Sequence, residues 1–244
     1  MAEVTVICAV WHKDPNRAAL IRGHAANLRR QTVAIDSVYV FDGGDVAPGD
    51  LEAETISAKT PLSIYQAWNL ALAAARTPFV MNLNLDDRLA PDAIEKLLTA
   101  IKDSQSMLVG GDWRICYTQA ETDDVDNRCV PARDLPFSPT WPPSPGIKTR
   151  LGSGTGERGT YGPATLWRMS AHAKIPRYPW RFTDGSLLNV IGDSVFWSIL
   201  QHLDAPLTRL PIVIGNYHSH PSDQAEFRWP DERARTAYLG IEML

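Results

Sequence analysis

The chain has 244 residues, a formal net charge of −4 and 44% hydrophobic residues. This composition is ordinary for a globular protein, and the length suits one large α/β domain or two small ones. The acidic balance disfavours a partner held mainly through a phosphate backbone, because such proteins are normally strongly basic. The three cysteines, Cys8, Cys116 and Cys129, lie far apart and predict neither a disulfide framework nor a thiolate zinc site.

The sequence predicts a cytoplasmic protein, with membrane association through a partner left open. The first residues, Met1 to Glu3, carry no basic region, and the apolar run after them is short. Neither a signal peptide nor a membrane span is therefore expected.

The N-terminal part of the chain alternates apolar runs with segments of helical periodicity. Apolar runs predict strands over residues 4–10, 37–41 and 54–57 and from 79 onward. Apolar residues at helical spacing predict helices after Pro15, after Ser63 and after Pro91. This alternation favours an α/β fold with a mostly parallel central sheet flanked by helices.

The pattern changes after residue 117. Residues 118–162 are rich in proline and glycine and hold no lasting hydrophobic period, which predicts a long loop that closes over a ligand. A strand is then expected over 164–169, a helix after Gly192 and a strand over 210–214. We therefore expect a single domain with a first half (1–117), a loop (118–162) and a second half (163–244).

Two adjacent carboxylates, Asp86 and Asp87, follow the apolar run that begins at Phe79 and precede the helix after Pro91. Ligands bind at the carboxyl ends of the strands in open α/β sheets. Carboxylates at that edge suit a hard divalent cation, and such a cation suits a diphosphate. Taken alone, the pair serves equally well as a helix cap and polar turn.

Other polar residues stand at similar positions. Asp42 follows an expected strand, and the two glycines after it permit a tight turn or a close approach to a ligand. Asp193 precedes a helical stripe, where an acid is also a good N-cap. His218 and His220 follow the last predicted strand. If that strand continues through them, both side chains point to the same face, and a His-x-His pair of this kind can bind a metal. The simpler alternatives are a polar turn, a cap and two surface histidines.

These features, in this order, resemble the family 2 glycosyltransferases, enzymes of the GT-A fold that use nucleotide-diphosphate sugars. The resemblance is carried by Val4–Val10, Val40–Gly44, Ala67–Ala75 and Leu83–Pro91. It covers residues 1–105 well and the remainder loosely. It implies a single Rossmann-like GT-A domain whose first half binds the nucleotide sugar and whose second half binds the acceptor.

By this resemblance Asn84, Leu85 and Asp86 occupy the family's Asp-x-Asp motif. Asp86 then binds Mn²⁺ or Mg²⁺, and Asn84 lies near the ribose or a metal-bound water. The family usually has aspartate where Asn84 stands, so metal affinity is expected to be weaker, with Asp87 in compensation. The residues expected beside the nucleotide base are Ala9, Val10, Trp11 and Asp42.

The resemblance also assigns roles in the second half. Asp193 looks like the acid that serves as general base toward the acceptor hydroxyl, although the family has a second acid where Gly192 stands. His220 looks like the C-terminal histidine that closes over the diphosphate or the metal.

The leading hypothesis is a metal-dependent, inverting, hexosyltransferase-like enzyme that uses a UDP- or GDP-sugar. Its acceptor is left open among saccharides, lipids, proteins and modified nucleic acids, the last disfavoured by charge. The alternative is a non-catalytic GT-A-like module that binds nucleotide or sugar or serves as a partner subunit, a reading favoured by Asn84 and Gly192. A nucleotidyltransferase ranks last, because no glycine-rich, lysine-bearing phosphate loop lies near the first strand.

Overall fold

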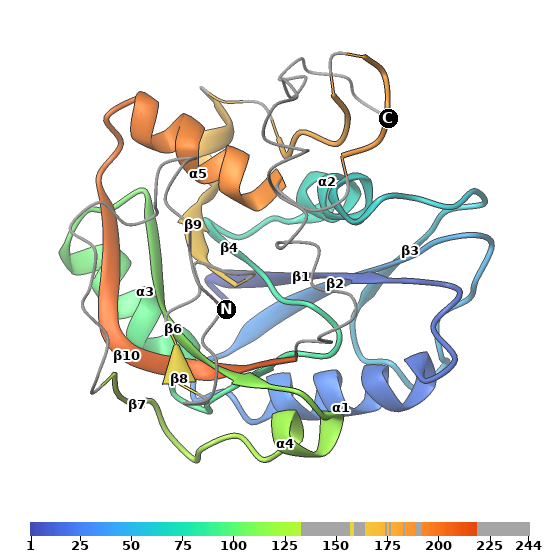
Figure 1. The fold of residues 1–244 in the computed structure, drawn as a ribbon, viewed down its shortest axis with the longest axis horizontal. Helices are drawn as coiled ribbons and strands as arrows, with labels where there is room; N and C mark the ends of the chain where they lie inside the picture. Colours follow the sequence, from blue (N-terminus) through green and yellow to red (C-terminus); the bar gives the residue numbers. More distant parts are fainter. Residues whose placement is uncertain are drawn as a thin grey trace.

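The computed structural model describes residues 1–132, 157–158, 164–173, 175, 177–182, 184–188 and 192–218. Over these residues the chain forms one large sheet with helices on both faces (Figure 1). The α/β fold expected from the sequence is confirmed. No helix in this part of the chain is long and apolar enough to cross a membrane.

The first half of the sheet is parallel. Its elements are β1 (Val4–Val10), α1 (Arg17–Arg29), β2 (Ile35–Phe41), β3 (Glu54–Ser57), α2 (Ile64–Ala74) and β4 (Phe79–Asn82). The strands lie in the order β3-β2-β1-β4, and every neighbouring pair is parallel. The carboxyl ends of β1, β2 and β4 therefore meet at one edge of the sheet, where ligands bind in this class of fold.

The second half of the sheet is mixed. Its elements are β5 (Arg88–Leu89), α3 (Ala93–Asp103), β6 (Leu108–Cys116), α4 (Gln119–Asp123), β7 (Val130–Pro131), β8 (Glu157–Arg158), β9 (Leu166–Arg168), a 3₁₀ turn (Met169–Ala173), α5 (Gly192–His202) and β10 (Leu207–His218). Strand β9 lies antiparallel between β4 and β6, whereas β10 is parallel to β6 and antiparallel to β5. The expected parallel pairing thus applies throughout the first half and, in the second half, to β6 and β10.

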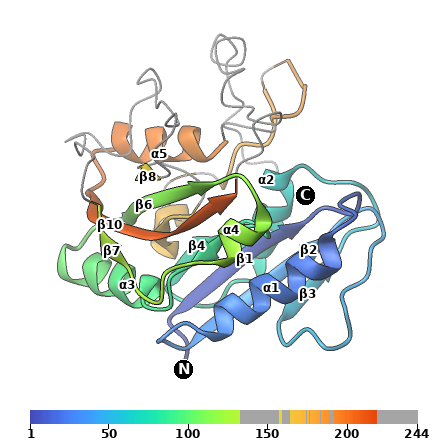
Figure 2. The same cartoon turned by 60° about the horizontal axis from the view of Figure 1, so that its bottom comes forward.

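The two faces of the sheet carry separate cores. Helices α2 and α5 cover one face, where Trp68 and Phe196 pack with the strand residue Val40. Helices α1 and α3 lie on the other face, where Leu28 and Leu97 join a second apolar cluster (Figure 2). Since α2 and α5 share one core, the residues at their ends are held in a fixed relation.

One predicted helix start is confirmed, and two other element boundaries differ from those expected. Ser63 caps α2 as predicted, in a reciprocal capping box with Gln66. Helix α1 begins at Arg17 rather than directly after Pro15. The last strand, predicted over 210–214, runs from 207 to 218 because it pairs with β6 over most of that length.

The start of the stretch predicted as a loop is structured. Residues 119–123 form α4, and Thr118 and Glu121 cap it reciprocally. This Thr-x-x-Glu pattern is a known signal for a helix start. The sequence analysis nevertheless predicted a loop here. Residues 133–156 and 159–162 of the predicted loop lie outside the described residues.

His24 is a fully buried imidazole on α1. Its Nδ1 lies 2.7 Å from the hydroxyl oxygen of Tyr39, and the two rings meet edge to face. Burial, with a smaller effect from the positive charge of Arg88, lowers the pKa of His24 to about 3. The folded protein therefore keeps this side chain neutral at pH values where an unfolded chain protonates it.

This burial predicts a pH-dependent loss of stability. An unfolded histidine has a pKa of about 6.5, so between that value and about 3 the unfolded state binds more protons, and stability falls as the pH falls. From pH 7 to pH 5, His24 should cost about 2 kcal/mol. Urea unfolding at both pH values should show this loss in the wild type and a flatter dependence in His24→Gln. Equal slopes would contradict the assignment.

Candidate active site

The acidic turn, residues 84–88, follows β4 at the carboxyl edge of the sheet. The amide of Leu83 donates to the carbonyl oxygen of Ile7 at 3.1 Å, which carries the pairing of β4 with β1 up to the turn. The amide of Asp87 then donates to the carbonyl oxygen of Asn84 at 3.2 Å and closes the turn. The turn therefore lies where the sequence placed it.

Arg88 holds the turn from beneath. Its Nη1 donates to the carbonyl oxygens of Leu85 at 2.9 Å and Asp87 at 2.7 Å. Its Nε lies 2.8 Å from a carboxylate oxygen of Asp123 in α4. Only 3% of Arg88 is exposed. A buried cation with three fixed partners leaves the backbone of the turn little freedom, and the sequence alone did not single this residue out.

The turn presents oxygen atoms that lack donors. Asp86 and Asn84 are half-buried, and Asp87 is fully buried. Oδ1 of Asn84 and Oδ2 of Asp87 are buried without a hydrogen-bond partner in the described structure. Burial, and next the charge of Asp86, hold the pKa of Asp87 well above its usual range. Such oxygens suit a hard divalent cation, which would satisfy them and offset the carboxylate charge.

The described residues do not form a complete metal cage. No group of three or more His, Cys, Asp or Glu side chains among them is arranged to hold an ion. Magnesium is usually bound by one or two carboxylates, with substrate phosphates and water supplying the other ligands. The oxygens of Asn84, Asp86 and Asp87 fit that manner of binding.

The final strand brings a histidine to the acidic turn. The amide of His218 donates to Oδ1 of Asp87 at 2.9 Å, and its Nδ1 lies 3.2 Å from the hydroxyl of Thr122. The antiparallel pairing of β10 with β5 sets this register, with Asn216 opposite Arg88. His220, which the sequence favoured as the ligand of the pair, lies outside the described residues.

Asp42 joins three chain segments at the same edge. Its Oδ1 accepts the backbone N–H of His12 and lies 2.8 Å from the Nδ1 of that residue, and its Oδ2 accepts the N–H of Leu62. Gly43 has a φ of +63°, and a Cβ there would come within 2.7 Å of the His12 ring. The glycine is therefore required for the turn that brings the ends of β1 and β2 together.

The other residues expected beside the base end β1 at this edge. Trp11 is 58% exposed, whereas Val10 is buried and Ala9 is half-buried. The Trp11 ring meets the His12 ring edge to face at 6.4 Å. An exposed indole at the binding edge of the sheet offers a surface on which a ring can stack.

Asp193 lies in the first turn of α5 and is half-buried. A Cβ on Gly192 would come within 2.7 Å of the Tyr65 ring, so that ring fills the space where the resemblance expects a second acid. Burial first, and then the charge of Asp193, raise the pKa of both Tyr65 and Tyr178. The departure at Gly192 therefore has a packing reason.

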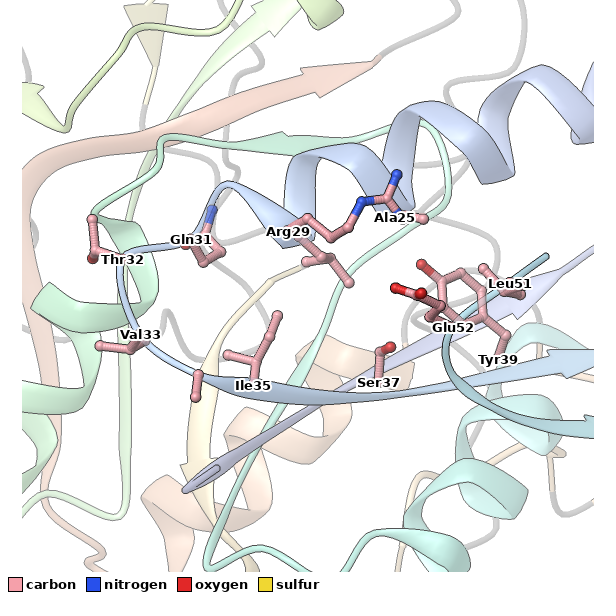
Figure 3. Close-up of a pocket in the computed structure, with 12 residues that line it drawn as sticks. Ala25, Arg29, Gln31, Thr32, Val33, Ile35, Ser37, Tyr39, Leu51 and Glu52 are labelled. Carbon is pink, nitrogen blue, oxygen red and sulfur yellow. The ribbon is translucent and has the colours of Figure 1, made fainter. Parts of the chain in front are cut away.

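A separate hollow lies on the α1 side of the sheet. It has a volume of about 340 Å³, and Arg29, Tyr39 and Glu52 contribute to its lining (Figure 3). None of the residues singled out in the sequence for donor or metal binding lines it. We therefore place the candidate site at the carboxyl edge of the strands.

Comparison with known families decides the classification. The family model described as "Glycosyl transferase family 2" matches residues 25–175. That segment is more than half of the chain and includes the acidic turn, the capped start of α2 and β9. The chain belongs to glycosyl transferase family 2. No curated protein matches it significantly by overall sequence.

Solved structures similar to this family 2 chain share its fold at low identity. Residues 1–349 of S. aureus TarS, in complex with UDP, are 16% identical with a TM-score of 0.59, and the match covers 96% of this chain and 65% of that one. The Pyrobaculum calidifontis mannosyltransferase PcManGT, with GDP-Man and Mn²⁺, is 16% identical with a TM-score of 0.60, covering 95% and 61%. The family 2 chain thus spans less than two thirds of these structures.

A more distant match concerns the third hypothesis. A CMP:2-keto-3-deoxy-manno-octonic acid synthetase in complex with CTP is 11% identical with a TM-score of 0.52, over 95% of this chain and 99% of that one. This likeness is one of fold alone. The family match keeps a nucleotidyltransferase in last place.

Proposed function

We propose that this family 2 chain is a metal-dependent, inverting glycosyltransferase that moves a sugar from a nucleotide-diphosphate donor to an acceptor hydroxyl. One observation carries the proposal. At the carboxyl edge of the sheet, half-exposed Asp86 stands beside buried oxygens of Asn84 and Asp87 that have no hydrogen-bond partner in the described structure. This arrangement supports a cation that carries a diphosphate.

The donor would lie along the ends of β1, β2 and β4. Asp42 would organise the part of the site that binds the nucleotide base. Its carboxylate accepts the backbone N–H of His12, which follows Trp11, and the backbone N–H of Leu62, which lies just before α2. Asp86, with the free oxygen of Asn84, would hold Mn²⁺ or Mg²⁺. When bound, the cation supplies positive charge to the diphosphate leaving group. Leu85 contributes its backbone, whose carbonyl oxygen is held by Arg88.

Asp193 would act as the general base. It takes the proton of the acceptor hydroxyl while the oxygen forms a bond to the anomeric carbon of the sugar. The bond from that carbon to the diphosphate oxygen breaks at the same time, and its electron pair leaves with the diphosphate. One such displacement inverts the configuration at the anomeric carbon.

The ligands of the similar structures support a UDP- or GDP-sugar as the donor. TarS has been solved with UDP and with UDP-GlcNAc, and the mannosyltransferase with GDP-Man. We therefore propose a UDP- or GDP-hexose as donor.

The rival function is a module that binds nucleotide sugar without turnover. Its support came from Asn84 and Gly192. The glycine at position 192 leaves room for the Tyr65 ring. Its presence is therefore explained without any loss of catalytic activity. Asn84 keeps an oxygen in the turn but lacks the charge of aspartate, so this residue alone still favours the rival. Turnover of a donor decides between the two.

Donor binding provides the first test. In thermal or urea unfolding, UDP-GlcNAc or GDP-Man at 100 times its dissociation constant should stabilise the wild type by about 2.7 kcal/mol, and more weakly without Mn²⁺. Asp86→Asn should lose the part that depends on Mn²⁺. Asp50→Asn, an equivalent change at an exposed loop position, should keep it. An equal Mn²⁺ effect in the wild type and Asp86→Asn would remove Asp86 from the metal site.

A further inference from the structure

Tyr65 of α2 meets the start of α5, far away in the sequence. The ring is 97% buried, since Tyr65 is 3% exposed. The nearest atoms to a Cβ built on Gly192 are the Tyr65 Cζ, Cε1 and Cε2, at 2.7 to 2.8 Å. The hydroxyl end of the ring therefore lies against the backbone of Gly192. Helices α2 and α5 share one core, which keeps this contact in place (Figure 1).

The phenol oxygen of Tyr65 serves the N-terminus of α5. The first N–H groups of a helix have no acceptor within the helix. Burial and the charge of Asp193 raise the pKa of Tyr65, and hydrogen bonding with the backbone of Gly192 and Asp193 opposes that rise. Helix α2 itself is capped by its neighbour Ser63. Tyr65 thus gives α5, from another helix, what a serine or aspartate usually gives from the adjacent residue.

We infer that Tyr65 is a positioning residue for Asp193: its hydroxyl caps α5 and so fixes the carboxylate that faces the acceptor. The inference rests on the proposed function, which makes Asp193 the general base. Gly192 is required for this arrangement, because any side chain there would displace the Tyr65 ring.

The residues that hold Tyr65 in place also connect to the proposed donor site. The Tyr65 ring stacks on Tyr178 with centroids 5.9 Å apart and meets Trp68 edge to face at 5.4 Å. The chain just before α2 is tied to Asp42 through the N–H of Leu62. The start of α2 therefore contacts both the proposed base end of the donor site and the proposed general base.

Two matched substitutions test the role of the hydroxyl. Tyr65→Phe keeps the ring and removes the cap. Tyr178→Phe removes the hydroxyl of the stacked partner, which has no hydrogen-bond partner in the described structure. With UDP-GlcNAc or GDP-Man and Mn²⁺, and water as acceptor, Tyr65→Phe should lower kcat roughly tenfold to a hundredfold and leave the donor KM within about twofold. Tyr178→Phe should keep kcat within about threefold and unfold no earlier than the wild type, since it loses only an unsatisfied group.

A double-mutant cycle separates positioning from a structural effect. If Tyr65 acts through Asp193, then Tyr65→Phe should change kcat by less than about twofold in an Asp193→Asn background. Additive losses in the double variant, an equal loss in Tyr178→Phe, or wild-type kcat in Tyr65→Phe would each overturn the inference. Full activity in Asp193→Asn alone would instead overturn the proposed general base, so the two failures are distinguishable.

Discussion

Asp193→Asn should lower donor turnover by a factor of about 10² to 10⁴, because it removes the proton acceptor and keeps the shape of the side chain. Donor affinity should stay near that of the wild type, since Asp193 lies on α5 and the proposed donor residues lie at the ends of β1 and β2 and in the acidic turn. Release of UDP or GDP from the donor, followed with Mn²⁺ present, measures the turnover. Calorimetric titration of the donor measures the affinity.

The matched control lies just beyond the other end of the same helix. Asp204 is exposed, with a φ of +51° that asparagine adopts well. Asp204→Asn should therefore keep full turnover. Equal turnover in the wild type and Asp193→Asn would show that another group takes the proton, or that the chain does not catalyse the transfer.

Gly23→Ala should destabilise the wild type and stabilise an Arg88→Met variant. A Cβ on Gly23, in α1, would come too close to Nη2 of Arg88 to be accommodated without movement. The guanidinium cannot move away easily, because Leu85, Asp87 and Asp123 all hold it. We expect a loss of about 1 to 3 kcal/mol in the wild-type background. Once the guanidinium is removed, the better helix propensity of alanine should give a gain of about 1 kcal/mol.

Urea unfolding of the four proteins in this cycle measures both effects. Arg88→Met alone should cost about 3 kcal/mol, since it removes a buried cation bound to two carbonyl oxygens and a carboxylate. Gly49→Ala is the control, because nothing lies within 4 Å of a Cβ at Gly49. The same sign for Gly23→Ala in both backgrounds would show that Arg88 is not fixed beneath the acidic turn.

Local signals in the sequence predicted the elements that depend on neighbouring residues. The Ser63 cap, the start of β4 and the acidic turn followed by a helix all come from patterns within a few residues. The capping residues Thr118 and Glu121 carried a signal of the same kind, which was missed because the surrounding stretch is rich in turn-forming residues.

Contacts between distant parts of the chain could not be predicted in this way. Asp87 binds the amide of His218, 131 residues later, only because β10 pairs with β5. Arg88 fits beneath α1 only because Gly23 lacks a side chain. The antiparallel insertion of β9 likewise follows from packing, since apolar runs carry no information on strand direction. The reason for Gly192 became clear only when the ring of Tyr65 was placed against it.

The central claim is that Asp86 carries the cation that binds the donor diphosphate. An anomalous difference map from a crystal containing Mn²⁺ and UDP-GlcNAc or GDP-Man tests it most directly. The account predicts a peak about 2.0 to 2.6 Å from a carboxylate oxygen of Asp86, the range of oxygen ligands to hard divalent cations, with the diphosphate on its other side. A donor bound at the strand edge with no peak at Asp86, or a peak at another group of residues, would contradict it.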